Sequence, residues 1–176
     1  VNSLTKEMTE NMDKFELGIA VQKVHDFIWD EFCDWYVEIA KYRIYHAEED
    51  SQSANCALWV LKTVLGQALK LLHPFMPFIT EEIYGALVPE EESLMMSSWP
   101  VYREDWKFPY ATEVIEHVKA ITRGIRNMRA EMNVPNNKRT KVYIISSDSK
   151  LLTALEVLKE SVKPLMLAND IILHYE

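Results

Sequence analysis

The sequence predicts a mainly α protein, in which an antiparallel helical bundle over residues 1–108 is followed by a small α/β unit over residues 109–176. Three observations lead to this fold class. Apolar residues recur at steps of three and four through nearly all of the first 88 residues. That period disappears over residues 88–109, which contain three prolines. Beyond the next helical stretch, two short runs typical of β-strands flank another helical run.

The first half of the chain should begin with a short helix over about residues 4–12 and continue with a long one. The apolar stripe of the long helix consists of Val21, Val24, Ile28, Phe32, Trp35, Ile39 and Tyr42. This helix also contains FIWDEFCDWY, whose five large aromatic side chains cannot all share one helical face. We expect the core to hold Phe27, Trp29, Phe32 and Trp35. A solvated acidic face should carry Asp26, Asp30, Asp34 and Glu38.

A second long helix is expected from the cap-like cluster at residues 51–53 to His73, because the residue before Pro74 is disfavoured in a helix. Its apolar residues are Leu58, Leu61, Leu65, Ala68, Leu69 and Leu72. Pro77 suits the first turn of a third helix, whose apolar side carries Ile83, Tyr84 and Leu87. The irregular segment that follows should pack on the bundle through Met95, Met96, Trp99, Trp106 and Phe108.

The second unit is expected to open with a helix that ends near Pro135. The stripe of this helix consists of Val114, Val118, Ile121, Ile125, Met128 and Met132. A strand over residues 141–146, a helix over 150–162 and a strand over 170–176 complete a helix-strand-helix-strand unit.

Composition excludes several classes of protein. Four glycines in 176 residues argue against a glycine-rich phosphate loop, and the absence of an apolar run of about 20 residues argues against a membrane span. Two dispersed cysteines, Cys33 and Cys56, indicate a reduced, cytoplasmic setting. The five histidines are isolated and no G-x-S-x-G occurs, so we expect neither a metal site nor catalytic activity. Since the chain begins at Val1, it is expected to be a piece of a longer soluble protein.

Charge is distributed unevenly along the chain. The net charge is −8, yet residues 119–141 contain seven basic residues against the single acid Glu131. A phosphate-contacting patch would be formed by Lys119, Arg123, Arg126 and Arg129. An ordinary exposed face, or a surface that packs against a neighbouring domain, explains the same pattern. The acidic remainder argues against nonspecific binding of polyanions.

Three segments resemble the valyl-tRNA synthetase family: KVHDFIWDEFCDWYVEIAK at 23–41, LLHPFMPFITEEIYGAL at 71–87 and IRNMRAEMNVPNNK at 125–138. The second is similar to a signature shared with isoleucine and leucine synthetases, and the other two favour valine. The resemblance implies an anticodon-binding domain with a small appended domain. HIGH-like and KMSKS-like motifs are absent from this chain, so ATP, Mg²⁺ and valine–tRNA ligation would belong to the parent's catalytic domain. The fragment itself should need no cofactor.

The resemblance also implies partners and site residues. The partners would be valine tRNAs and the remaining domains of the synthetase, with the fragment itself a monomer. Tyr36, Val37 and Glu38 would face the anticodon, whose middle and third letters, A and C, both carry amino groups that a carboxylate can accept from. Because a basic and aromatic helix of the family lies upstream of residue 1, binding should be selective but weak. Two alternatives stay open: Glu38 only extends the acidic face, or the bundle is a protein-interaction module without RNA.

Overall fold

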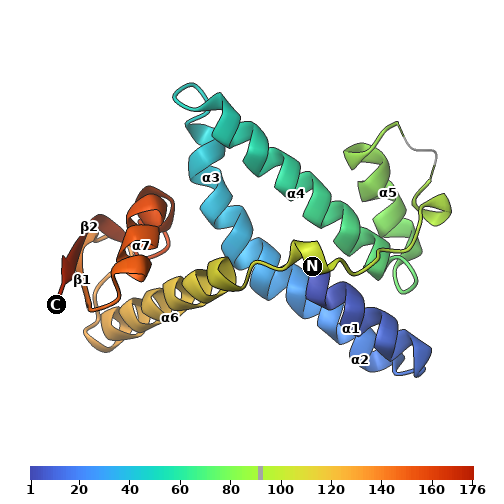
Figure 1. Cartoon of the computed structure of the whole chain (residues 1–176), viewed down its shortest axis with the longest axis horizontal. Coiled ribbons are helices and arrows are strands. Elements are labelled where there is room, and N and C mark those ends of the chain that lie inside the picture. The colour runs from blue at the N-terminus through green and yellow to red at the C-terminus, as the bar shows by residue number, and fades with distance from the viewer. Residues whose placement is uncertain (91–92) are drawn as a thin grey trace. The chain divides into compact units, whose positions relative to one another are not determined.

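A computed structural model describes residues 1–90 and 93–176 and confirms the mainly α fold class (Figure 1). The chain divides into two units, Val1–Lys107 and Phe108–Glu176. The division lies one residue before the boundary that the loss of helical period predicts.

The first unit is built from helices that agree with the sequence pattern. They are α1 (Asn2–Asp13), α2 (Leu17–Asp26), η1 (Phe27–Val37), α3 (Glu38–Tyr45), α4 (Ser51–Leu72) and α5 (Pro77–Leu87). The elements α2, η1 and α3 form one uninterrupted helix, which turns back at residues 46–50 into α4 (Figure 1). Asp50, rather than the serines after it, caps α4 by accepting a 2.9 Å hydrogen bond from the Ser53 backbone N–H. Pro77 is the first residue of α5, as predicted.

The core of this unit lies along the inward stripe of the long helix. Val24, Phe32, Trp35 and Ile39 are buried, as their spacing predicts. Leu4, Met8, Ala20, Val24 and Leu71 form one buried cluster that joins α1, α2 and the end of α4. A second cluster of Leu69, Tyr84 and Leu94 fixes α5 against α4.

Three apolar residues that we expected inside lie at the surface. Trp29 is 57% exposed, and Leu58 and Ile83 are also exposed. The expectation for Trp29 was wrong because η1 presents Phe32 and Trp35 to the core, which leaves the ring of Trp29 on the outward side beside His25.

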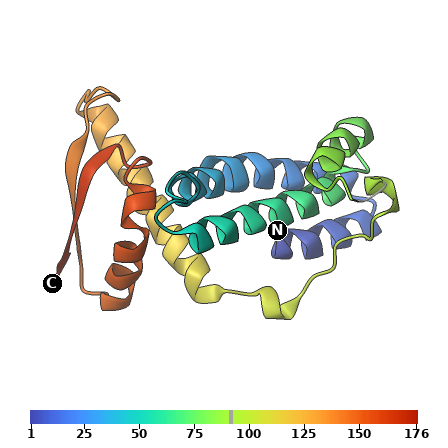
Figure 2. The same cartoon turned by 90° about the horizontal axis from the view of Figure 1, so that it is seen from above.

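The segment after α5 contacts the bundle through Trp99, as predicted, and through Leu94, which was not predicted. Leu94 of the short helix η2 (Leu94–Met96) is buried, whereas Met95, Met96 and Phe108 are exposed, since a three-residue turn directs only one side chain inward. Figure 2 shows the segment passing α1, where the Trp99 indole N–H donates to Thr9 Oγ1 at 3.0 Å. A second short helix, η3 (Glu104–Trp106), follows. Glu91 and Glu92 of this segment lie outside the described residues.

The second unit has the predicted helix-strand-helix-strand order. It consists of α6 (Pro109–Glu131), β1 (Thr140–Ser146), α7 (Ser149–Val162) and β2 (Ala168–Tyr175). The strands pair in parallel from Thr140 opposite Ala168 to Ser146 opposite Tyr175, and α7 makes the crossover. One face of the sheet is packed by α7, with Val142, Leu155 and Ile171 buried. No helix in residues 1–90 and 93–176 has the length and apolar content that crossing a bilayer requires.

The cluster around Met8 yields a test of the bundle. Met8→Ala should lower the free energy of unfolding by about 2–5 kcal/mol, because the side chain is fully buried and its removal leaves a cavity. Met96→Ala, in an exposed methionine, should change it by less than about 0.5 kcal/mol. Urea unfolding of both variants checks this, and equal effects would contradict the assignment of Met8 to the core.

Candidate nucleic-acid interface

The predicted anticodon residues lie where the long helix changes its winding. The stretch Phe27–Val37 is π-helical, a wider form that is rare in proteins and is frequently found at functional sites. Tyr36 and Val37 are its last residues, and Glu38 is the first residue of α3. Since η1 runs straight into α3, the backbone N–H groups at Glu38 are inside a continuous helix. Its carboxylate therefore does not serve as a helix cap.

Tyr36 points toward α4. It is half-buried, its ring lies 6.2 Å from that of Phe32 at 21°, and burial raises the pKa of its phenol. Two nearby groups also affect the pKa of the hydroxyl, which Arg43 lowers and Cys56 raises. Arg43 Nε donates a hydrogen bond to Ser53 Oγ at 2.7 Å. Tyr36 is therefore a neutral hydrogen-bonding group at the junction of the long helix and α4.

Glu38 lies on a different side of the helix from Tyr36. Side chains two positions apart in a helix point in directions that differ by roughly 200° around its axis, so the structure does not bring these two side chains together. Glu38 is part-exposed and accepts a hydrogen bond from Lys41 Nζ, a bond that raises the pKa of the lysine. Tyr45, one turn beyond Lys41, is exposed. We call Glu38, Lys41 and Tyr45 the α3 face; Val37 lies half-buried beside it.

The α3 face is distinct from the acidic face that precedes it. Asp26, Asp30 and Asp34 are exposed, and Asp26 accepts a 2.6 Å hydrogen bond from Gln22 Nε2. Glu38 is less exposed and is held by a cation on its own helix. The spacing Glu-x-x-Lys was the signal in the sequence for this pair, and it was overlooked.

An exposed tryptophan on α4 was also missed. Trp59 is 63% exposed and follows Cys56 by one helical turn, on the helix that Tyr36 faces. Because it falls outside the stripe of Leu61 and Leu65, its position could have been identified from periodicity alone. An exposed indole is a surface on which an unstacked base can stack.

The four predicted phosphate-binding residues separate into two kinds. Lys119 is 3% exposed and bonds Glu116 at 2.7 Å, and Arg129 is 7% exposed. The guanidinium of Arg129 donates to the carbonyls of Pro135 and Lys138, at 3.0 and 2.7 Å, and to Thr140 Oγ1 at 3.2 Å. These loop carbonyls need donors, which explains why a cation is buried at the end of a helix.

The other two are at the surface. Arg123 is exposed, and Arg126 is exposed while its Nε donates to the Leu165 carbonyl at 3.0 Å. The expectation of a phosphate-contacting patch was therefore wrong for the buried Lys119 and Arg129, and it stays a prediction for Arg123 and Arg126. The burial of Arg129 also explains why Met128, expected in the stripe, is exposed.

The two units differ in charge. Residues 1–107 contain 9 lysines and arginines against 19 aspartates and glutamates, and residues 108–176 contain 10 against 8. Within residues 1–90 and 93–176, no three histidine, cysteine, aspartate or glutamate side chains are placed to hold a metal ion.

Most of this chain matches a known protein family. The family model described as the anticodon-binding domain of tRNA ligase matches residues 1–144. The chain belongs to this family. The matched part of this anticodon-binding domain runs through the bundle and α6 into β1. The expected division near residue 108 therefore lies between two units of the fold. It does not coincide with the end of the matched family region, which extends to residue 144.

Several relatives of this anticodon-binding domain are valine–tRNA ligases. That of Clostridium perfringens is 50% identical over 147 residues, which are 84% of this chain and 16% of the relative. Those of Carboxydothermus hydrogenoformans and Bacillus thuringiensis are 42% and 40% identical over 155 residues, 88% of this chain and 17% of each relative. The chain thus spans about a sixth of the length of the relatives it matches.

The buried arginine gives a prediction for the second unit. Arg129→Met should lower the free energy of unfolding by about 2–4 kcal/mol, because three acceptors lose their donor while the apolar stem is kept. Lys138→Ala is the matched control, since only the backbone carbonyl of Lys138 takes part. Urea unfolding followed by a probe in the second unit distinguishes the two. A loss in Arg129→Met as small as in the control would contradict the structural role.

Proposed function

We propose that this domain docks the anticodon loop of valine tRNA for a valine–tRNA ligase. The parent enzyme would carry out ATP- and Mg²⁺-dependent ligation in another domain and would work in the cytoplasm, while this chain contributes no catalytic residue and is monomeric. The observation that supports the proposal is the family match over residues 1–144, combined with the α3 face, where a carboxylate, a cation and an aromatic ring stand together.

The chemistry of the α3 face suits the bases of a valine anticodon. The middle A and the third C both carry exocyclic amino groups, and a carboxylate such as Glu38 accepts from them. Lys41 offsets the charge of Glu38 and offers a contact to the phosphate of the same nucleotide. Exposed Tyr45 and Trp59 supply aromatic faces for splayed bases. The proposal therefore assigns recognition to Glu38 and affinity mainly to stacking.

Electrostatics sets the expected strength of binding. The first unit has ten more acidic than basic residues, which disfavours contact with phosphates that lack a specific partner. Binding should thus be selective for base identity and weak in absolute terms.

Glu38→Gln tests the recognition step. The amide keeps the shape of the side chain but replaces one acceptor oxygen with a donor, so discrimination between the valine stem-loop and one with its middle A replaced should fall by about 10-fold. Isothermal titration with both stem-loops measures this, and Glu48→Gln, at an exposed glutamate beyond α3, is the control. Unchanged discrimination in Glu38→Gln would support the rival interpretation, in which Glu38 only extends the acidic face.

Trp59→Ala tests the stacking step. Loss of a base–aromatic contact is worth about 1–3 kcal/mol, so the dissociation constant for the valine stem-loop should rise by about 5- to 150-fold. Trp29→Ala removes an indole of similar exposure, which lies beside His25 on the long helix and outside the α3 face, and should leave binding unchanged. Fluorescence anisotropy with labelled stem-loop compares them. Equal losses, or none in either variant, would refute a stacking role for Trp59.

A further inference from the structure

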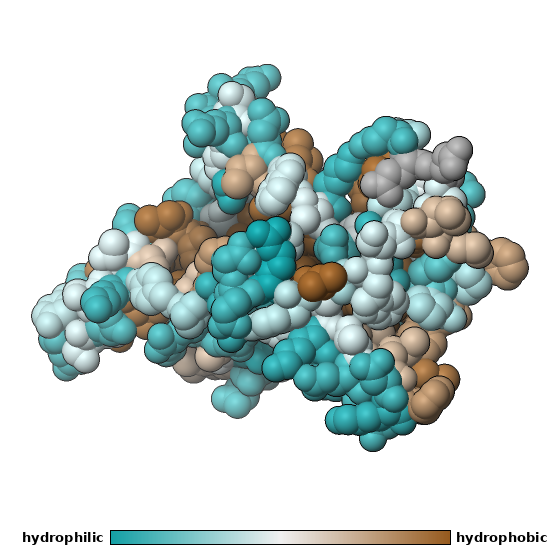
Figure 3. Space-filling model, turned by 45° about the vertical axis from the view of Figure 1, so that its right-hand side comes forward, coloured by the Kyte–Doolittle hydropathy of each residue, from teal (hydrophilic) through white to brown (hydrophobic). Residues whose placement is uncertain are grey.

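A group of large apolar side chains is exposed where α5 begins and where η2 follows it. The group consists of Met76, Phe78, Ile79, Ile83, Met95 and Met96, and Phe78 is 90% exposed. We call these residues the α5 face. Figure 3 shows light brown surface beside the residues drawn in grey, in this part of the first unit. Large exposed apolar side chains grouped in this way on a folded domain mark an interaction site.

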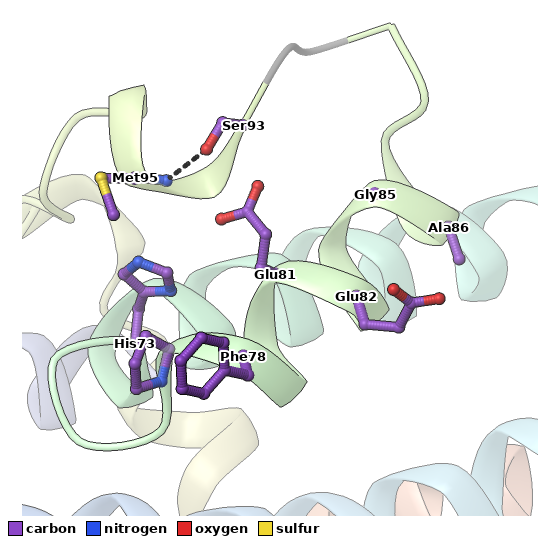
Figure 4. Close-up of a pocket in the computed structure, with 9 residues that line it drawn as sticks. His73, Phe78, Glu81, Glu82, Gly85, Ala86, Ser93 and Met95 are labelled. Carbon is purple, nitrogen blue, oxygen red and sulfur yellow. Dashed lines mark hydrogen bonds between the residues drawn. The ribbon is translucent and has the colours of Figure 1, made fainter.

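The α5 face is folded around a hollow. A concavity of about 660 Å³ lies between α5 and η2, and Figure 4 shows His73, Phe78, Glu81 and Met95 arranged around it. Gly85 and Ala86 form part of its lining, and a Cβ added at Gly85 would meet no atom within 4 Å. The absence of bulk there leaves room for the side chains of a docking segment.

Hydrogen bonds hold this surface in place. Thr80 is fully buried, and its hydroxyl donates to the Met76 carbonyl and accepts from His73 Nδ1, both at 2.8 Å. The Glu81 carboxylate accepts from the Leu94 N–H at 3.0 Å, and its bonds to Ser93 and Leu94 hold the pKa of Glu81 below its usual range. The exposure of Phe78 and Met95 is therefore a property of a fixed structure, not of a frayed helix end.

We propose that the α5 face docks against another domain of the same ligase polypeptide, through an apolar segment that carries a lysine or arginine opposite Glu82. This inference rests on the proposed function. The relatives are about six times longer than this chain, which supplies domains to cover the surface. Among the described residues that line the hollow are Glu81 and Glu82 and no lysine or arginine, which favours a cationic apolar segment over RNA. A second copy of this chain would bring the same carboxylates together.

Oxidative footprinting tests the docking. The residues Met76, Phe78, Met95 and Met96 should be oxidised several-fold more slowly in the full-length ligase than in this chain alone. Equal rates in both would overturn the proposal. Protection that grows with the concentration of the isolated chain would identify a second copy instead, and protection on adding valine stem-loop would identify RNA; both would overturn it. Stem-loop binding by the isolated chain reports separately on the proposed function.

Gly85→Leu provides a variant that blocks the hollow without disturbing the fold. Because nothing lies near its Cβ and leucine favours helix, the melting temperature of the isolated chain should stay the same or rise. In the full-length ligase the variant should abolish most of the protection of Met95. Gly124→Leu, at an equally open helical glycine on α6, is the matched control and should leave that protection intact. Full protection of Met95 in Gly85→Leu would refute the site.

Discussion

The burial of one side of the long helix from Leu17 to Tyr45 is the constraint on which the first unit depends. Val24, Phe32, Trp35 and Ile39 are buried along it, through stretches of α, π and again α winding. Burying these side chains removes a large apolar area from water, and no hydrogen bond at the surface competes with that gain in free energy. Once this side is fixed inward, the opposite side is fixed outward, and Glu38, Lys41 and Tyr45 are presented to solvent as one face.

Charge has different roles in the two units. In the first unit the described acidic residues of the long helix that precede Glu38 lie exposed at the surface, where water solvates them, whereas Glu38 is less exposed and pairs with Lys41. In the second unit part of the basic cluster stabilises the fold: Arg129 satisfies loop carbonyls from inside. A count of charges along the sequence combines these two kinds of cation, although only an exposed one is available to a phosphate.

The proposed function and the further inference place two surfaces on the first unit. The α3 face combines polar and aromatic groups, which suits unpaired bases. The α5 face combines apolar side chains with carboxylates, which suits a protein segment. Their chemistry differs because a base edge offers hydrogen-bonding groups and a π-face, whereas an apolar protein segment offers mainly hydrophobic area.

The sequence by itself determined the mainly α class, the order of the elements and the start of α5 at Pro77, because period, proline and β-branched runs act over a few residues. The role of Glu38 in binding the anticodon stays a prediction from the sequence. The sequence did not predict the π-helical winding of η1, the exposure of Trp29, Met95 and Met96, or the burial of Lys119 and Arg129. Those depend on which of several apolar or charged side chains finds a partner in a distant segment. Only the tertiary structure decides that, since residues of the same type and spacing compete for the same limited core.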